Sequence, residues 1–255
     1  MRFALLGSGS EGNALVVEVG ATRVLMDCGF SLSETVSRLA RLDLEPEALD
    51  AIVVTHEHGD HIGGVARLAR KFSLPVFLTH GTLRSQQGAF ADIGAVSEIN
   101  PHQSFSVGAV LIQPYPVPHD ASEPVQYVFS DGSRRLGVLT DTGCATPHIE
   151  ATLSGCDALV LECNHDVDLL QNGEYPYSLK QRVGGRFGHL NNRDAAALLA
   201  RLDNSRLQRL VAAHLSHKNN TAALAVGALR EVLADAEDRI CVATQEAGLP
   251  WCEIA

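Results

Sequence analysis

One short segment concentrates the residue types that bind metal ions. Five of the seven residues in the stretch THEHGDH, at 55–61, are histidine, aspartate or glutamate, and the stretch follows a short apolar run. In an extended segment residues i and i+2 project to one side, so His56 and His58 can bind one ion. Asp60 and His61, beyond a glycine bend, can reach a second ion. A solvated polar loop is the alternative, and so many ligand types together disfavour it.

Three further residues stand where a predicted strand gives way to a loop, namely His119, Asp141 and His214. Side chains at the ends of strands converge in open α/β sheets. Each of the three, taken alone, has the ordinary interpretation of a polar loop residue. Together with the THEHGDH stretch they complete a set of seven ligands, which predicts a two-metal site.

Composition limits the classes of protein to consider. The chain has 255 residues, of which 45% are hydrophobic, so it can bury roughly 75% of its unfolded surface, and we expect one domain spanning 1–255. The net charge of −10 argues against a surface that coats nucleic acid indiscriminately. Six cysteines form no CxxC pair, no stretch of about 20 apolar residues occurs, and the first apolar run is too short for the core of a signal sequence, so we expect none. We therefore expect a cytoplasmic location, reduced thiols and no membrane partner.

The elements that must position the ligands follow from periodicity and turn residues. Strands are predicted at residues 3–6, 15–19, 23–26, 51–54, 76–78, 106–112, 126–129, 135–139, 158–161, 207–212, 240–242 and 250–253. Helices are predicted at residues 33–42, 61–72, 82–90, 195–202 and 222–234. The first three strands indicate a β-meander. Mixed sheets with helices on their outer faces predict an α/β fold of the four-layer αββα sandwich type.

A glycine-rich stretch near the start, Gly7-x-Gly9-x-x-Gly12, matches the dinucleotide fingerprint only superficially. That fingerprint must open a helix, whereas residues 14–19 are strand-like. The stretch is therefore interpreted as a hairpin loop. Its polar residues, predicted to lie at the rim of the site and to bind a substrate phosphate, are Ser8, Ser10 and Asn13.

The order HxHxDH, His, Asp, His over nearly the whole chain resembles the metallo-β-lactamase superfamily. The resemblance implies that fold and a metal-dependent hydrolase with two divalent ions per chain, manganese or zinc. It also divides the seven ligands between the ions. Metal one takes His56, His58 and His119, metal two takes Asp60, His61 and His214, and Asp141 bridges them.

Finer motifs resemble the YycJ/WalJ-type branch, regarded as metal-dependent 5′-to-3′ DNA exonucleases. They are SGSEGN at 8–13, DCG at 27–29, LECNHD at 161–166, YPYSLKQR at 175–182, GHLNN at 188–192 and HLSHKNN at 214–220. The 73 positions from Asp141 to His214 (214 − 141) leave no room for the cap domain of β-CASP nucleases. The implied partner is a nucleic acid, DNA with a 5′ end.

The expected reaction is phosphodiester hydrolysis by a hydroxide held between two ions about 3.5 to 4 Å apart. Asp60 is the predicted orienting group and proton acceptor. His165 and His189, outside the ligand set, are candidates to protonate the leaving oxygen. Each also has a purely structural interpretation. Glu162, at the end of a predicted strand, is expected to orient a ligand histidine.

The segment 174–193 carries four basic residues against one acidic residue, in a chain that is acidic overall. It predicts a phosphate-binding surface that includes Lys180, Arg182 and His189. A solvated face is the alternative.

Three functions therefore compete. The first is a DNA exonuclease. The second is a hydrolase of a small cyclic or simple phosphodiester, or of a thioester. The third, disfavoured because structural metal sites are usually closed, is a non-catalytic metal-binding module.

Overall fold

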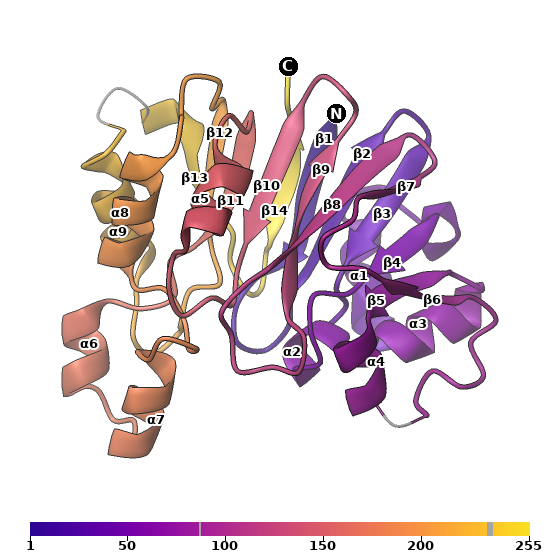
Figure 1. Ribbon diagram of the computed structural model, residues 1–255, viewed down its shortest axis with the longest axis horizontal. Helices are drawn as coiled ribbons and strands as arrows, with labels where there is room; N and C mark the ends of the chain where they lie inside the picture. Colours follow the sequence, from indigo (N-terminus) through magenta and orange to yellow (C-terminus); the bar gives the residue numbers. More distant parts are fainter. Residues whose placement is uncertain (87, 234–236) are drawn as a thin grey trace.

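Two mixed β-sheets pack face to face in the computed structural model, which describes residues 1–86, 88–233 and 237–255 (Figure 1). The first sheet has the order β14 (Leu249–Glu253), β1 (Arg2–Gly7), β2 (Ala14–Val19), β3 (Thr22–Met26), β4 (Ala51–Val53), β5 (Val76–Thr79), β6 (Val96–Ile99). The second has the order β13 (Ile240–Val242), β12 (Arg209–Ala213), β11 (Ala158–Glu162), β10 (Arg135–Leu139), β9 (Val125–Ser130), β8 (Val110–Pro116), β7 (Phe105–Val107). Among these described residues, no helix has the length and hydropathy needed to cross a bilayer.

Helices cover the outer faces of both sheets (Figure 1). The first sheet is flanked by α1 (Leu32–Ala40), α3 (Val65–Phe72) and α4 (His80–Ser85), and the second by α5 (Pro147–Leu153), α8 (Asn192–Arg201) and α9 (Ala222–Arg230). Three apolar cores result, one between the sheets and one under each helical layer. The predicted four-layer αββα sandwich is confirmed.

The direction of the strands decides where the loops gather. β3 to β6 run parallel in the first sheet, and β10 to β13 run parallel in the second. Their carboxyl ends open at one edge of the sandwich, the lower edge in Figure 1, where α2 (Gly59–Ile62) lies between the sheets. Helices α6 (Val167–Asn172) and α7 (Tyr177–Val183) extend from the second half of the chain at the same edge.

Several predicted elements differ from the observed ones. The helix expected at 61–72 is interrupted at Gly63 and Gly64, between α2 and α3. Glycines favour such a break, and at Gly64 a side chain would overlap Phe30 and Cys28. The strand expected at 106–112 is the hairpin β7–β8, which turns at Gly108 with φ of +51°. The helices expected at 82–90 and 222–234 end at Ser85 and Arg230, and residues 87 and 234 lie outside the described residues.

Candidate metal centre

The parallel register of the second sheet brings three functional side chains together. Leu139 of β10 pairs with Leu161 of β11, which pairs with Ala212 of β12. Glu162 is the next residue on β11, and Asp141 and His214 each lie two positions beyond the aligned residues of their strands. Three polar side chains therefore leave adjacent strands at one level.

The first predicted ligand triad is a compact group of imidazoles. His58 Nδ1 lies 3.0 Å from His56 Nε2 and 3.2 Å from His119 Nε2. His56 and His119 are buried, and His58 is half-buried at the edge of the cavity. Three nitrogens this close together can surround a single ion, as metal ligands do.

The second triad lies beside the first, and Asp141 connects them. Asp60 Oδ2 is 3.6 Å from His61 Nε2 and 3.8 Å from His214 Nε2. Asp141 Oδ2 is 3.1 Å from His61 Nε2, while its Oδ1 is 3.5 Å from His214 Nε2 and 3.9 Å from His119 Nε2. Asp141 is thus the one carboxylate of the seven residues that approaches histidines of both triads.

The residues fit divalent metal ions. Asp141 Oδ2 and His214 Nε2 are buried and make no hydrogen bond, which is costly for polar atoms unless a cation satisfies them. Imidazole and carboxylate ligands suit both zinc and manganese. The arrangement can therefore hold divalent metal, and the assignment of individual ligands stays a prediction.

A buried carboxylate orients the histidines of the THEHGDH stretch. Asp27 accepts hydrogen bonds of 2.8 Å from the amide and the hydroxyl of Thr55, and it lies 2.8 Å from His61 Nδ1. The Thr55 hydroxyl lies 2.9 Å from His56 Nδ1. Protons held at Nδ1 leave the Nε2 lone pairs free for a metal. Sequence reasoning missed the role of Asp27, although its position in the DCG motif after a strand was a usable signal.

Glu162 performs the same task for the other half of the site. It is fully buried, and its Oε1 lies 2.8 Å from His189 Nδ1 and 3.2 Å from His214 Nδ1. Its Oε2 accepts hydrogen bonds of 3.0 Å from the Thr142 amide and 3.1 Å from the Leu190 amide. Both oxygens are fully used, so Glu162 orients histidines and is not free to bind a metal itself.

The charges of the cluster compensate one another. Burial alone would lower the pKa of His214, but the carboxylates of Asp141, Asp60 and Glu162 raise it to about 10. Burial alone would raise the pKa of Glu162, but its interactions with His189 and His214 lower it to about 2. Burial and the neighbouring His61 lower the pKa of His56, and Asp141 offsets them only in part. The carboxylates therefore stay ionised, and their charge attracts either imidazolium protons or metal cations.

Backbone strain collects at the centre. Three of the five non-glycine residues with positive φ in the described parts of the chain are Asp27 (60°), Asp141 (50°) and His214 (57°). Each follows the end of a strand, and the left-handed conformation turns its side chain toward the site. Such conformations cost about 1 kcal/mol or more each and persist where the surrounding structure imposes them.

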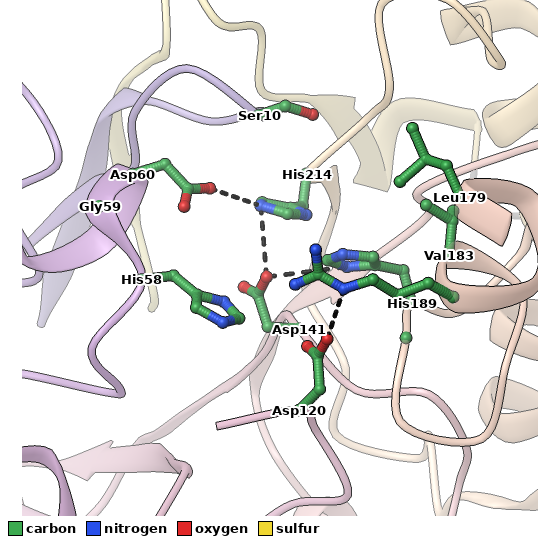
Figure 2. Close-up of a pocket in the computed structure, with 12 residues that line it drawn as sticks. Ser10, His58, Gly59, Asp60, Asp120, Asp141, Leu179, Val183, His189 and His214 are labelled. Atoms are coloured by element: carbon green, nitrogen blue, oxygen red, sulfur yellow. Dashed lines mark hydrogen bonds and ion pairs between the residues drawn. The ribbon is translucent and has the colours of Figure 1, made fainter. Parts of the chain in front are cut away.

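The metal centre opens into a cavity of about 360 Å³, which is lined by His58 of the first triad, by Asp60 and His214 of the second, and by Asp141. Figure 2 shows Asp60 and His58 on one side of it and Leu179 and Val183 of α7 on the other. Arg182 also lines the cavity, and its Nε lies 2.6 Å from Asp120 Oδ2. The full set of lining residues is Ser10, His58, Gly59, Asp60, Asp120, Asp141, Leu179, Arg182, Val183, Gly188, His189 and His214.

The glycine-rich loop was predicted to present Ser8, Ser10 and Asn13 at the rim, which is wrong for two of them. Ser8 is buried, and its hydroxyl accepts a 2.8 Å hydrogen bond from the His214 amide. Asn13 is also buried, exchanges hydrogen bonds with the backbone of Gly9 and lies 3.1 Å from His61 Nε2. Both residues support ligands from behind, and only Ser10 lines the cavity.

The remaining predicted residues divide in the same way. His189 and Arg182 line the cavity, whereas His165 and Lys180 do not. His165 is buried close to Gly184, with Nδ1 3.2 Å from the Asn164 side chain, and burial lowers its pKa to about 4. Lys180 donates a 2.8 Å hydrogen bond to the Gln171 carbonyl, joining α7 to the end of α6. The structural interpretation therefore fits His165.

Comparison with known proteins places this geometry in a family. The model of the β-lactamase superfamily domain matches residues 22–215. The chain belongs to the β-lactamase superfamily. Exodeoxyribonuclease YycJ of Bacillus anthracis is 35% identical over 92% of this chain and 90% of its own. Exodeoxyribonuclease WalJ of Streptococcus pneumoniae is 34% identical over 92% and 89%.

The fold comparison agrees. The metallo-β-lactamase fold protein YhfI from Bacillus subtilis superimposes with a TM-score of 0.77 over 98% of both chains, at 18% identity. The present superfamily member is a metal-dependent hydrolase.

Proposed function

We propose that this superfamily member is a metal-dependent exodeoxyribonuclease that hydrolyses DNA from a 5′ end. The observation that carries the proposal is a carboxylate, Asp141, that approaches histidines of both triads at the floor of an open cavity, beside the guanidinium of Arg182. The exodeoxyribonuclease names of relatives about 35% identical over most of the chain support the same activity.

Two ions per chain, manganese or zinc, complete the proposal. His56, His58 and His119 would hold one, Asp60, His61 and His214 the other, and Asp141 both. When bound, such ions lower the pKa of water and stabilise the charge that develops on a phosphodiester during hydrolysis. Asp60 lines the cavity, which supports the proposal that its carboxylate would also orient the attacking water and accept its proton.

His189 would serve the leaving group. Its Nδ1 is held by Glu162, which leaves Nε2 for a group in the cavity that His189 lines. The ion pair with Glu162 stabilises an imidazolium whose Nε2 proton can pass to the leaving oxygen. His189→Ala should therefore retain the metal content of wild type, measured by elemental analysis, and lose about 10²-fold in kcat. A kcat within about threefold of wild type, with the metals in place, would contradict this role.

Arg182 would bind a phosphate of the substrate. Its guanidinium lines the cavity, and Asp120 holds it by one nitrogen, which leaves further donors for a phosphate. Arg182 belongs to the segment 174–193, where basic residues outnumber acidic ones in a chain whose net charge is −10. With divalent ions bound beside Arg182, the cavity would attract a polyanionic substrate, which the net negative charge of the chain otherwise disfavours.

The test is an activity panel with the metal-reconstituted protein. We expect degradation of 5′-phosphorylated DNA, single-stranded or duplex, from the 5′ end, and none by Asp141→Asn, whose metal content is measured in parallel. Bis-p-nitrophenyl phosphate and a thioester complete the panel. Turnover of a small substrate without turnover of DNA would replace the proposal with a small-molecule hydrolase. Fewer than one ion bound per chain would remove the two-metal assignment.

A further inference from the structure

One wall of the cavity is apolar, although most of the other side chains that line it are polar or charged. Leu179 and Val183 lie four residues apart on α7, which places them on one face of the helix, and both line the cavity. Figure 2 shows their side chains on the side opposite Asp60 and His58. Neither metal binding nor phosphate binding requires apolar surface at this position.

These side chains do not serve a core. None of the seven residues of α7 is buried, and Leu179 and Val183 are half-exposed. The helix is instead attached through polar contacts, in which Lys180 bonds the Gln171 carbonyl and Arg182 pairs with Asp120. These contacts hold α7 with its apolar face toward the cavity. Apolar surface that faces a solvent-filled cavity is typical of a binding site.

Phe187 presents exposed aromatic surface on the loop that carries two residues of the cavity lining. Its side chain is 62% exposed, and it directly precedes two lining residues, Gly188 and His189. The loop that carries it is fixed, because the Phe187 carbonyl accepts a 3.0 Å hydrogen bond from the Asp120 amide. On its other side, the backbone of Gly143 lies so close to this loop that a side chain there would overlap it. The backbone at Phe187 is therefore held on both sides, and the side chain stays exposed.

We propose that Leu179 and Val183, extended by Phe187, form the subsite for the nucleobase of the terminal nucleotide. The proposal rests on the proposed function, since the metal cluster would hold the phosphodiester that joins this nucleotide to the next. A cavity of about 360 Å³ is at the small end of the range of ligand sites, about 300–1,000 Å³, and suits one nucleotide better than a base pair.

The chemistry of the wall defines the substrate class. Aliphatic and aromatic side chains contact the face of any base and read none of its hydrogen-bonding edges, so the subsite accepts all four bases. A base reaches the wall only after it leaves its partner and its neighbour in the stack. The substrate is therefore an unpaired DNA end, and a fully paired blunt end must fray first.

The experiment compares normal oligonucleotides with oligonucleotides whose terminal nucleotide is abasic, at the 5′ and the 3′ end in turn. We expect the metal-loaded wild type to lose about tenfold in kcat/KM when the base at the digested end is absent. The double variant Leu179→Ala, Val183→Ala should lose about as much on the normal end and little further on the abasic end. Leu179→Met, which keeps an apolar side chain of similar volume, should keep most of the wild-type difference in kcat/KM between normal and abasic ends.

Binding supplies a second readout. A terminal 2-aminopurine should change its fluorescence on binding to wild type, and less on binding to Phe187→Ala. Leu224→Ala, which removes an exposed apolar side chain from α9, is the matched control and should change nothing. Equal kcat/KM for normal and abasic ends in wild type would overturn the subsite. So would a double variant that loses as much kcat/KM on the abasic substrate as on the normal one. Failure of wild type to cut any oligonucleotide would instead refute the proposed function.

Discussion

Glu162→Gln tests how the fold controls the metal ligands. The two side chains have the same shape, so the substitution creates no cavity. Each oxygen of Glu162 meets two nitrogens, Nδ1 of His189 and of His214 at Oε1 and the amides of Thr142 and Leu190 at Oε2. A carboxamide places an NH₂ group at one of these two positions. Donors then face donors in a fully buried place.

The two orientations of the amide have different costs. An NH₂ toward Thr142 and Leu190 leaves two buried amides without an acceptor, at about 1–3 kcal/mol each, or about 2–6 kcal/mol of unfolding free energy. An NH₂ toward the histidines can be accepted only if both imidazoles give up the proton at Nδ1 and carry one at Nε2 alone. For His214 that nitrogen faces Asp60 and Asp141, so the predicted ligand atom is blocked. Loss of such an orienting group typically weakens metal binding by about 10–100-fold.

We expect the second orientation to dominate, because it avoids the larger loss of stability. Calorimetric titration of the metal-stripped variant with manganese and with zinc should show an affinity about 10–100-fold below that of wild type. Urea unfolding of the metal-free variant should show a loss of unfolding free energy below the about 2–6 kcal/mol expected for the first orientation. Glu150→Gln is the control, since that carboxylate pairs with Arg201 and does not line the cavity. Metal affinity within about threefold of wild type, with unchanged unfolding, would refute the orienting role.

Three further outcomes are expected. Asp27→Asn should weaken metal binding in the same titration, because Asp27 Oδ2 lies 2.8 Å from His61 Nδ1 and the amide would disturb that contact; unaltered affinity would contradict it. Gly143→Ala should lower the unfolding free energy by about 2 kcal/mol or more, measured with urea, since its Cβ would overlap the neighbouring backbone; an unchanged midpoint would show that the loop yields freely. Arg182→Ala should raise KM for DNA about tenfold and Lys180→Ala should not, because only Arg182 lines the cavity; equal effects would locate phosphate binding elsewhere.

The sequence by itself determined the fold class and the site's chemical character. The strands of the β-meander, the buried strands and the helices each have a hydrophobic pattern that repeats over a few residues, and such a pattern can be recognised in the sequence. The stretch at 55–61 and the residues that end later strands are of ligand type whatever their partners. Since loops at the carboxyl ends of parallel strands must share an edge, the meeting of His56, Asp141 and His214 could be predicted.

Only the tertiary structure decided which polar residues face the cavity and which stand behind it. Ser8 and Asn13 share a loop with Ser10, yet they are buried because Ser8 packs against His214 and Asn13 against His61, two predicted ligands. Arg182 and Lys180 are two residues apart, yet Arg182 pairs with Asp120 on the His119 loop and Lys180 with the Gln171 carbonyl at the end of α6. No periodic pattern in the sequence indicates either partner. Helix α7 buries no residue, so it has no core-facing pattern to detect. Which polar residues face the cavity depends on strand register and on packing between distant segments, and local periodicity carries no information about either.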